Sequence, residues 1–323
     1  MRLRHLRPMQ RGPHFVRNAL LVAAVVALVL AGTYLVVTLK PASQSTEVKV
    51  LTTFYPVYDY TRIIGGDRIN VSLLVPMTLD VHAFEPTPSS VQAVATASVL
   101  IYNGAGLEPW IPSIVAAADN PRLVLVDSSA NVSLLRVPPA FQKENRTIDP
   151  HVWLSPVLAK VQVANILKGL LKVDPANAAY FTANAHAYSA KLDVLDSEFV
   201  NLTANPATRF FVTFHEAFAY FAKQYNLTQI PIAGPFEEDP TPSEIQNVID
   251  AVHAHHLCYV GYESLTNPAI AESIASQTNA TLIRLDPIEG LSLTDQALGM
   301  TYLLKMQDGF TKFALALNHV GCS

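Results

Sequence analysis

The feature that most constrains the fold is an alternation of short apolar runs with helix-length segments, interrupted once by a long helical stretch. Runs such as Val48–Thr52, Val99–Tyr102 and Arg209–Phe214 have the length of buried strands, and helical patterns follow them. This alternation is typical of βαβ units and a mainly parallel sheet. Between two such series, Ala176–Leu202 shows apolar residues at helical spacing and contains no proline. A helix of that length spans about 40 Å, enough to run from one lobe to another.

We therefore predict an α/β protein with two similar lobes, each a mainly parallel sheet flanked by helices, joined by one long rigid helix. The expected boundaries are an N-terminal lobe at 47–150, a helical segment at 151–205 and a C-terminal lobe at 206–323. Periodicity fades over 127–150, which predicts a loop of about twenty residues. The last helix is expected as one piece over Asp295–Ala316.

The N-terminal 46 residues differ from the rest in composition. Residues 1–18 are basic, 19–39 carry no charge, and 40–46 have the composition of a flexible linker. A helix over 19–39 would be about 31 Å long, which matches a bilayer core. The basic flank predicts a cytoplasmic N-terminus and an extracytoplasmic body, periplasmic or extracellular. The length favours an uncleaved anchor in the cell membrane, and a cleaved signal sequence with a secreted body is the alternative.

Charge and cysteine usage narrow the class of protein further. The chain has 22 basic and 26 acidic residues, and all the acids follow residue 40. An acidic exported body argues against nucleic-acid binding. Cys258 and Cys322 are the only cysteines, and in an exported chain they predict one disulfide that fixes the C-terminus to a strand. Sequons that would accept N-glycans in a glycosylating organism occur at Asn70, Asn131, Asn145, Asn201, Asn226 and Asn279.

Three histidines and one carboxylate form the candidate metal site. His82, His151, His215 and Asp286 each lie at a strand end or just before a helix, far apart in the sequence. Ligands of open α/β sheets bind outside the carboxyl ends of the strands, so we expect these side chains to meet in the cleft between the lobes. Three imidazoles and a carboxylate can enclose a divalent transition metal. Glu263 and Glu289 are the alternatives to Asp286.

Other interpretations of these residues and their neighbours are also open. Taken singly, each histidine also fits a structural role in a loop or at a helix start. Glu85 and Asp149 are expected to orient ligand histidines, because a ligating imidazole donates its second N–H to a carboxylate or carbonyl. The group His253, His255 and His256 ends a predicted helix, where imidazolium suits the helix dipole.

Four ordered motifs resemble the metal-binding receptors of zinc and manganese ABC importers. They are the runs at 80–88, 149–156, 213–222 and 285–287, which read DVHAFEPTP, DPHVWLSP, TFHEAFAYFA and LDP. The resemblance implies a monomeric two-lobe receptor that captures a divalent metal ion through His82, His151, His215 and Asp286. It would hand this ion to an ABC permease in the membrane and would not be an enzyme.

The resemblance favours zinc, Zn2+, as the bound transport substrate, with manganese, Mn2+, next. A histidine at 215 is similar to the zinc pattern, and imidazole ligands suit zinc while manganese prefers oxygen. The loop 127–150 contains no histidine, unlike the long histidine-rich loop of many zinc members. One alternative is a surface adhesion protein with the same fold. Another is a metallohydrolase with three protein ligands, a water and Glu216 as general base.

Overall fold

The computed structural model describes residues 24–28, 48–142, 146–236 and 239–322, and the chain divides into a unit at 1–46 and a unit at 47–323. The predicted basic N-terminus, membrane anchor and linker lie outside the described residues, apart from a short helical stretch at 24–28. Among the residues described, no helix combines the length and apolar character needed to cross a membrane. The fold below is that of the second unit.

The N-terminal lobe is a parallel sheet with strand order β2-β1-β3-β4. Its strands and helices follow the predicted βαβ alternation: β1 (Val48–Thr52), α2 (Tyr55–Gly65), β2 (Ile69–Leu73), α3 (Pro88–Thr96), β3 (Val99–Tyr102), α4 (Ile111–Ala118) and β4 (Val124–Asp127). Thr87 caps α3 through its side chain, and Pro88 occupies the first helical turn, where no amide donor is needed. Because the strands are parallel, their carboxyl ends all lie at one edge of the sheet.

The C-terminal lobe repeats this order as β6-β5-β7-β8, again with parallel strands. Its elements are β5 (Phe210–His215), α7 (Ala219–Gln224), β6 (Thr228–Ala233), α8 (Pro242–Ala254), β7 (Tyr259–Tyr262), α9 (Ala269–Thr278) and β8 (Thr281–Arg284). A proline, Pro231, is tolerated within β6 because this strand lies at the sheet edge. The predicted pair of similar α/β lobes is thus confirmed.

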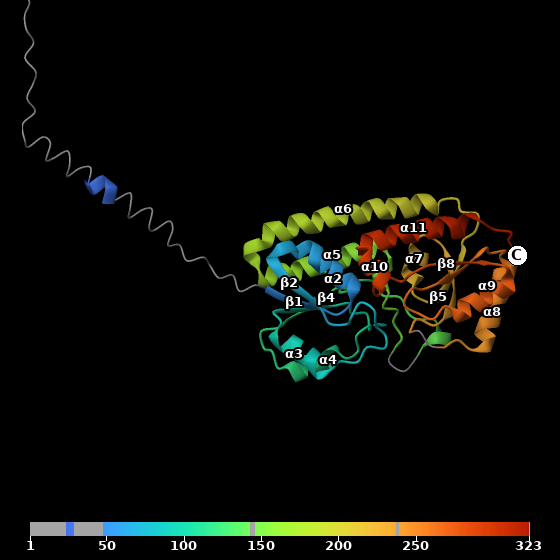
Figure 1. Cartoon of the computed structure of the whole chain (residues 1–323), viewed down its shortest axis with the longest axis horizontal. Coiled ribbons are helices and arrows are strands. Elements are labelled where there is room, and N and C mark those ends of the chain that lie inside the picture. The colour runs from blue at the N-terminus through green and yellow to red at the C-terminus, as the bar shows by residue number, and fades with distance from the viewer. Residues whose placement is uncertain (1–23, 29–47, 143–145, 237–238, 323) are drawn as a thin grey trace, which may run out of the picture. The chain divides into compact units, whose positions relative to one another are not determined.

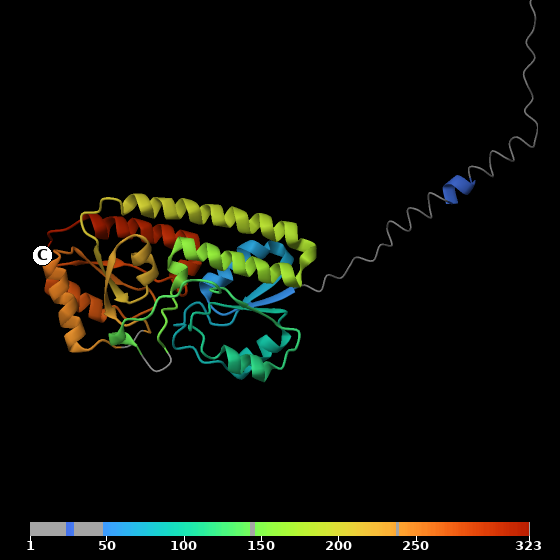
Figure 2. The same ribbon diagram turned by 180° about the vertical axis from the view of Figure 1, so that it is seen from behind.

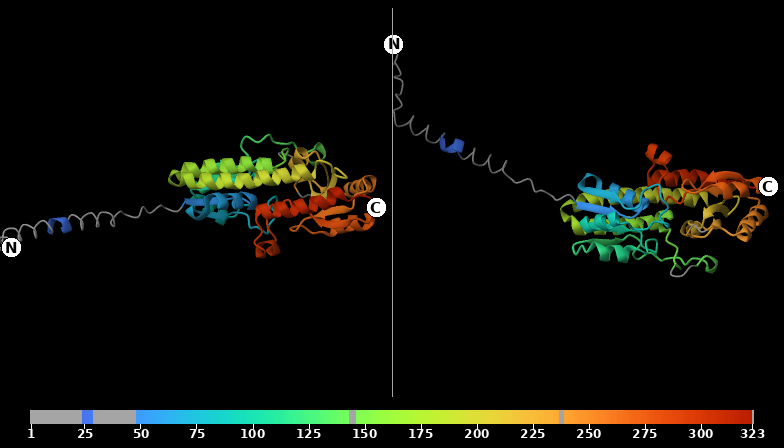
Figure 3. Two further views of the ribbon diagram at one scale, coloured as in Figure 1. Left: turned by 90° about the horizontal axis from the view of Figure 1, so that it is seen from above. Right: turned by 60° about the horizontal axis from the view of Figure 1, so that its bottom comes forward.

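The long helix α6 (Ala178–Leu202) lies beside α5 (Pro156–Val173) and reaches both lobes (Figures 1 and 3). Its buried residues recur every three to four positions, which gives one apolar stripe along its length. In the middle of α6, Tyr188 packs on Tyr60 of α2 with ring centroids 5.7 Å apart. Near its end, Phe199 packs on Phe221 of α7 at 4.9 Å. The predicted connecting helix is confirmed, and Figure 2 shows the same span from behind.

Each lobe has a small apolar cluster of its own, and a third, larger cluster is shared by both lobes. A single cluster of buried side chains includes Val50 and Ile101 from the first sheet and Phe211 and Ile283 from the second. Close to this junction Trp153 is fully buried. Close-packed cores do not deform continuously, so this shared cluster limits hinge motion between the lobes.

The C-terminal region departs from the prediction of one last helix. Two helices are present, α10 (Leu293–Ala297) and α11 (Tyr302–Asn318). Gly299 between them adopts the left-handed conformation with φ of 64°, and Thr301 caps α11 by accepting a hydrogen bond from Leu304 N–H. Glycine after a helix and threonine before the next are standard stop and start signals, so the continuous apolar pattern was misleading.

The disulfide between Cys258 and Cys322 is present, as predicted. An antiparallel bridge between Leu257 and Val320 lies beside it, so the chain end docks next to β7.

The stretch after β4 folds back through an antiparallel bridge between Arg136 and Ile148. This return places the Asp149–His151 segment beside the other site residues.

Candidate metal centre

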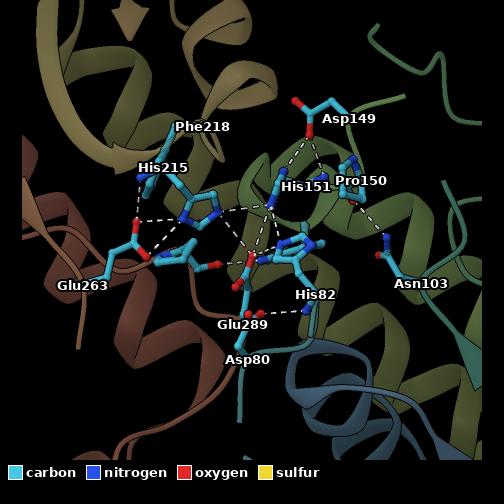
Figure 4. Close-up of polar contacts among 12 residues, drawn as sticks. Asp80, His82, Asn103, Asp149, Pro150, His151, His215, Phe218, Glu263 and Glu289 are labelled. Atoms are coloured by element: carbon cyan, nitrogen blue, oxygen red, sulfur yellow. Dashed lines mark hydrogen bonds and ion pairs between the residues drawn. The ribbon is translucent and has the colours of Figure 1, made fainter. Parts of the chain in front are cut away.

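Four segments bring one potential ligand each to the junction of the lobes (Figure 4). His82 lies in the turn between β2 and α3, and His151 immediately precedes the short 3-10 helix Val152–Leu154. His215 is the last residue of β5, and Glu289 lies in the connection between β8 and α10. The two lobes and the segment between them therefore all contribute, as expected for a site at the carboxyl ends of parallel strands.

The four ligand atoms converge on one point. The Nε2 atom of His151 lies 3.3 Å from Nε2 of His82 and 3.3 Å from Nε2 of His215. Glu289 Oε1 lies 3.0 Å, 3.1 Å and 3.5 Å from Nε2 of His82, His151 and His215, respectively. All four side chains are at most 5% exposed.

These separations match a tetrahedral zinc site. With metal–ligand bonds of about 2.0–2.1 Å, the edge of a regular tetrahedron of ligand atoms is about 3.3 Å. The five separations given above, 3.0–3.5 Å, scatter around that edge, and all four atoms lie within 4.8 Å of one another. The side chains can thus hold the ion with little movement.

The tautomers of two histidines also favour a cation between them. His151 Nδ1 lies 2.7 Å from Asp149 Oδ1, and His215 Nδ1 lies 2.9 Å from Glu263 Oε1. A carboxylate only accepts, so both Nδ1 atoms donate, and in neutral rings both Nε2 atoms carry a lone pair. Two lone pairs that face each other at 3.3 Å beside a carboxylate oxygen repel unless a cation or proton lies between them.

The acid–base properties of the cluster reflect its burial and charge. Burial opposes the charged imidazoles, but the hydrogen-bonded Asp149 carboxylate, with Glu289, raises the pKa of His151 above its ordinary value. Burial likewise lowers the pKa of His215, but the charges of Glu263 and Glu289 outweigh it and raise this pKa well above the ordinary value. Burial would raise the pKa of Glu289, but His82 and His215 hold it well below its usual range. Without metal, the site therefore attracts protons.

The structure differs from the sequence prediction at the fourth position. It brings His82, His151 and His215 together with Glu289, one of the two alternatives, and Asp286 is not in this cluster. The Asp286 carboxylate instead forms ion pairs with Lys305 and Arg284 and accepts a hydrogen bond from Ser264 N–H at 2.6 Å. An aspartate already neutralised by a buried lysine is a poor candidate for the metal.

Supporting contacts fix the histidine segments from behind. Asp149 holds His151 twice, through Nδ1 and through the backbone N–H at 2.9 Å. Glu263, at the end of β7, holds His215 in the same two ways, with the backbone contact at 3.1 Å. The expectation for Asp149 agrees with this geometry. Glu85, by contrast, is solvent-exposed.

Two further groups support the loop that carries His151. Tyr220 donates its hydroxyl to Asp149 O at 2.8 Å, and Asn103 donates from Nδ2 to Pro150 O at 2.9 Å. Both partners come from distant segments, and no short motif could have identified them. Glu216, next to His215, has a pKa that burial raises to about 7.

Comparisons with known proteins agree with the geometry. The sequence model of the ZnuA family, described as zinc-uptake complex component A, periplasmic, matches residues 50–316. The high-affinity zinc uptake system protein ZnuA of Bacillus subtilis strain 168 is 32% identical over 270 residues, which cover 81% of this chain and 85% of that protein.

Solved structures show the same fold. Zn(II)-bound AdcA from Streptococcus pneumoniae superposes with a TM-score of 0.74 at 28% identity, covering 85% of this chain but only 59% of AdcA. This chain therefore spans little more than half of that relative. The laminin-binding protein Lmb of Streptococcus agalactiae, described as bifunctional with adhesin and metal-transporting activity, has a TM-score of 0.75 at 29% identity, covering 84% of this chain and all of Lmb.

Proposed function

This chain belongs to the ZnuA family of zinc-uptake components, and from that premise we propose that it is a receptor that captures one zinc ion outside the cytoplasm and delivers it to an ABC permease. The proposed ligands are His82, His151, His215 and Glu289. Zinc is the substrate of this receptor, bound in transit and released to the permease.

One observation supports the proposal above all others. Three imidazole Nε2 atoms and one carboxylate oxygen converge with separations close to those of a tetrahedral zinc site, and carboxylates orient two of the rings. Three nitrogen ligands and a single carboxylate favour zinc over manganese, which prefers oxygen. Manganese remains the next candidate.

The same ligand count argues against a metallohydrolase. A catalytic zinc keeps a coordination position open for water, whereas a fourth protein ligand at Glu289 fills a tetrahedral site. Glu216 supplies a partly buried carboxylate of the kind that a hydrolase needs as a base. We propose that the chain has no enzymatic role, and a water in place of Glu289 in the zinc complex would reopen that alternative.

The adhesion alternative has one specific observation in its favour, the structural likeness to Lmb. Adhesion and metal capture are not exclusive in that protein. For this chain, binding to immobilised laminin with and without zinc would decide, and Glu289→Gln should leave any adhesion intact.

The proposal extends to the location of the protein and its attachment to the membrane. The Cys258–Cys322 disulfide supports an oxidising extracytoplasmic compartment. We propose a monomeric receptor tethered through residues 19–39. Recovery of the full-length chain in the membrane fraction would support the tether, and a mature chain that lacks residues 1–39 would contradict it.

The decisive experiment is a zinc titration of the metal-stripped full chain in competition with a chromophoric chelator. We expect one tight equivalent that manganese does not displace at equal concentration. Glu289→Gln should weaken zinc binding, whereas the matched control Glu272→Gln, on the exposed surface of α9, should not. The absence of stoichiometric zinc in the wild type would overturn the proposal.

A further inference from the structure

A buried lysine lies behind the segment that carries Glu289. Lys305 of α11 is 2% exposed in its side chain, and its ammonium group contacts the carboxylates of Asp286 and Asp295. The contact to Asp295 Oδ2 measures 3.1 Å. Taking an ammonium group out of water is costly, so such a lysine persists only where opposite charges compensate it.

The Asp286 carboxylate joins three segments of the chain. Its Oδ2 atom contacts Lys305 and lies 3.4 Å from Arg284 Nε, while its Oδ1 atom accepts from Ser264 N–H at 2.6 Å. The end of β8, the turn after β7 and helix α11 therefore meet at one carboxylate. With these partners Asp286 acts as an anchor for the chain that follows it.

The three residues after this anchor lead directly to Glu289. Trp153 donates from Nε1 to Pro287 O at 2.7 Å, and Leu291 N–H donates to Met77 O at 2.8 Å. Between these contacts, buried Ile288 has φ of 62°. A β-branched residue in the left-handed region is strained and persists only when its surroundings hold it. Glu289 thus sits on a strained segment that depends on its attachments.

The environment makes the Lys305 contact hard to replace. On one side, Lys305 and Asp286 line an apolar hollow with Phe218 and Phe221. On the other side, Asp286 and Glu289 line a second hollow that opens next to the metal cluster. Without Lys305, the Asp286 carboxylate would keep only Arg284 and the Ser264 N–H as described partners beside this apolar hollow. Turning toward the second hollow would move the segment that bears Glu289.

We propose that Lys305 is a positioning residue for the metal site, which holds Glu289 Oε1 at the three imidazoles by anchoring Asp286. This inference rests on the proposed function, because Glu289 matters here as a zinc ligand. It also accounts for the choice between the two carboxylates: Lys305 occupies Asp286 and leaves Glu289 for the metal.

A double-mutant cycle between Lys305 and Glu289 tests the inference, with zinc affinity measured by chelator competition on the full chain. Lys305→Met should weaken zinc binding about tenfold, within the range for outer partners of metal ligands. In the Glu289→Gln background the same substitution should have almost no further effect, since the residue it positions no longer coordinates. Lys312→Met is the matched control, because Lys312 lies on the same helix and pairs with Asp308, which contacts Arg284 but no residue of 286–289 among the contacts described.

The outcomes separate the inference from the proposed function. Wild-type affinity in Lys305→Met, or an equal loss in both backgrounds, would overturn the positioning role while zinc binding by the wild type stands. No zinc binding by the wild type would instead overturn the proposed function. If Lys305→Met fails to fold, Asp286→Asn takes its place in the cycle. It removes the anchoring charge and leaves Lys305 paired with Asp295, with the same expected non-additivity.

Discussion

The site consists of two unlike halves. His151 and His215 are fully buried, and a carboxylate holds both Nδ1 and the backbone N–H of each. His82 and Glu289 come from connections in the two different lobes, and His82 Nε2 lies 3.0 Å from Glu289 Oε1. The backbone N–H of His82 donates to Asp80 at 2.7 Å, and Glu289 follows strained Ile288. We call His151 and His215, which carboxylates fix, the held pair. We call His82 and Glu289, which contacts within their connections fix, the loop pair.

This difference teaches how a receptor can bind tightly and still release its ion. The held pair is preorganised, so its side chains lose little conformational entropy when zinc binds. The loop pair can separate while the shared core and α6 keep the lobes in place. Zinc exchange would then need local movement of two connections and no large hinge rotation.

Loss of a held ligand should have the largest effect. We expect His215→Ala to weaken zinc binding by more than about 100-fold, beyond the range for outer partners, because it also leaves Glu263 buried without its imidazole. His82→Ala should cost less. Chelator competition measures both, and a larger loss for His82→Ala would break the comparison.

Acid should release zinc at an unusually high pH. The raised pKa of His151 and His215 means that protons occupy these rings above the ordinary imidazole value. Zinc affinity should therefore fall as the pH drops through these raised values, beginning above pH 6.5 and changing about tenfold per pH unit for each proton displaced. Affinity measured from pH 8.5 to 5.5 checks this, and a constant affinity down to pH 6 would contradict it.

The same linkage predicts how the stability of the metal-free protein varies with pH. A group whose pKa is raised by folding stabilises the fold below its unfolded pKa, and that contribution is lost as the pH rises through the folded value. The melting temperature of the stripped protein should thus decrease on going above pH 6.5, and zinc should restore it there. Calorimetry on stripped and loaded samples provides the measurement.

The carboxylates behind the held pair should have intermediate effects. Asp149→Asn removes the acceptor that fixes the His151 tautomer, and we expect about 10- to 100-fold weaker zinc binding. Asp80→Asn is the matched control on the loop pair, because the Asp80 carboxylate accepts only from the backbone N–H of His82 among the contacts described. Equal losses in the two variants would remove the distinction between the halves.

Zinc should change local dynamics only modestly. We expect zinc to slow amide hydrogen exchange measurably, but by less than about tenfold, in the segments around His82 and at 286–291. Exchange in β5 should stay unchanged. Exchange monitored by mass spectrometry with and without zinc checks this pattern. Comparable exchange in the loop segments in both states, or protection spread over both lobes, would contradict it.

Most of the fold could be predicted because local rules agreed with tertiary structure. The strand at Val48–Thr52 and the cap at Thr87 were correct because their apolar pattern and turn chemistry matched the parallel sheet. The last helix was wrong because Gly299 and Thr301 carried stop and start signals inside a continuous apolar pattern. Local chemistry outweighed periodicity there.

The candidate site was predictable in its histidines and not in its carboxylate. Each histidine lies at a strand end or before a helix, where the topology of parallel sheets brings side chains together. Asp286 and Glu289 both follow β8, and the sequence offers no reason to prefer the second. In the positioning role that we propose, the choice depends on Lys305, which lies on α11 and meets Asp286 only through tertiary packing.

The most direct test of the account is a crystal structure of the zinc-loaded protein with anomalous scattering measured at the zinc edge. We predict one zinc ion bound by Nε2 of His82, His151 and His215 and by a Glu289 oxygen, with bonds of about 2.0–2.2 Å. In that structure Asp286 should remain paired with Lys305. A zinc ion bound by Asp286, or by three histidines and a water with Glu289 turned away, would contradict it.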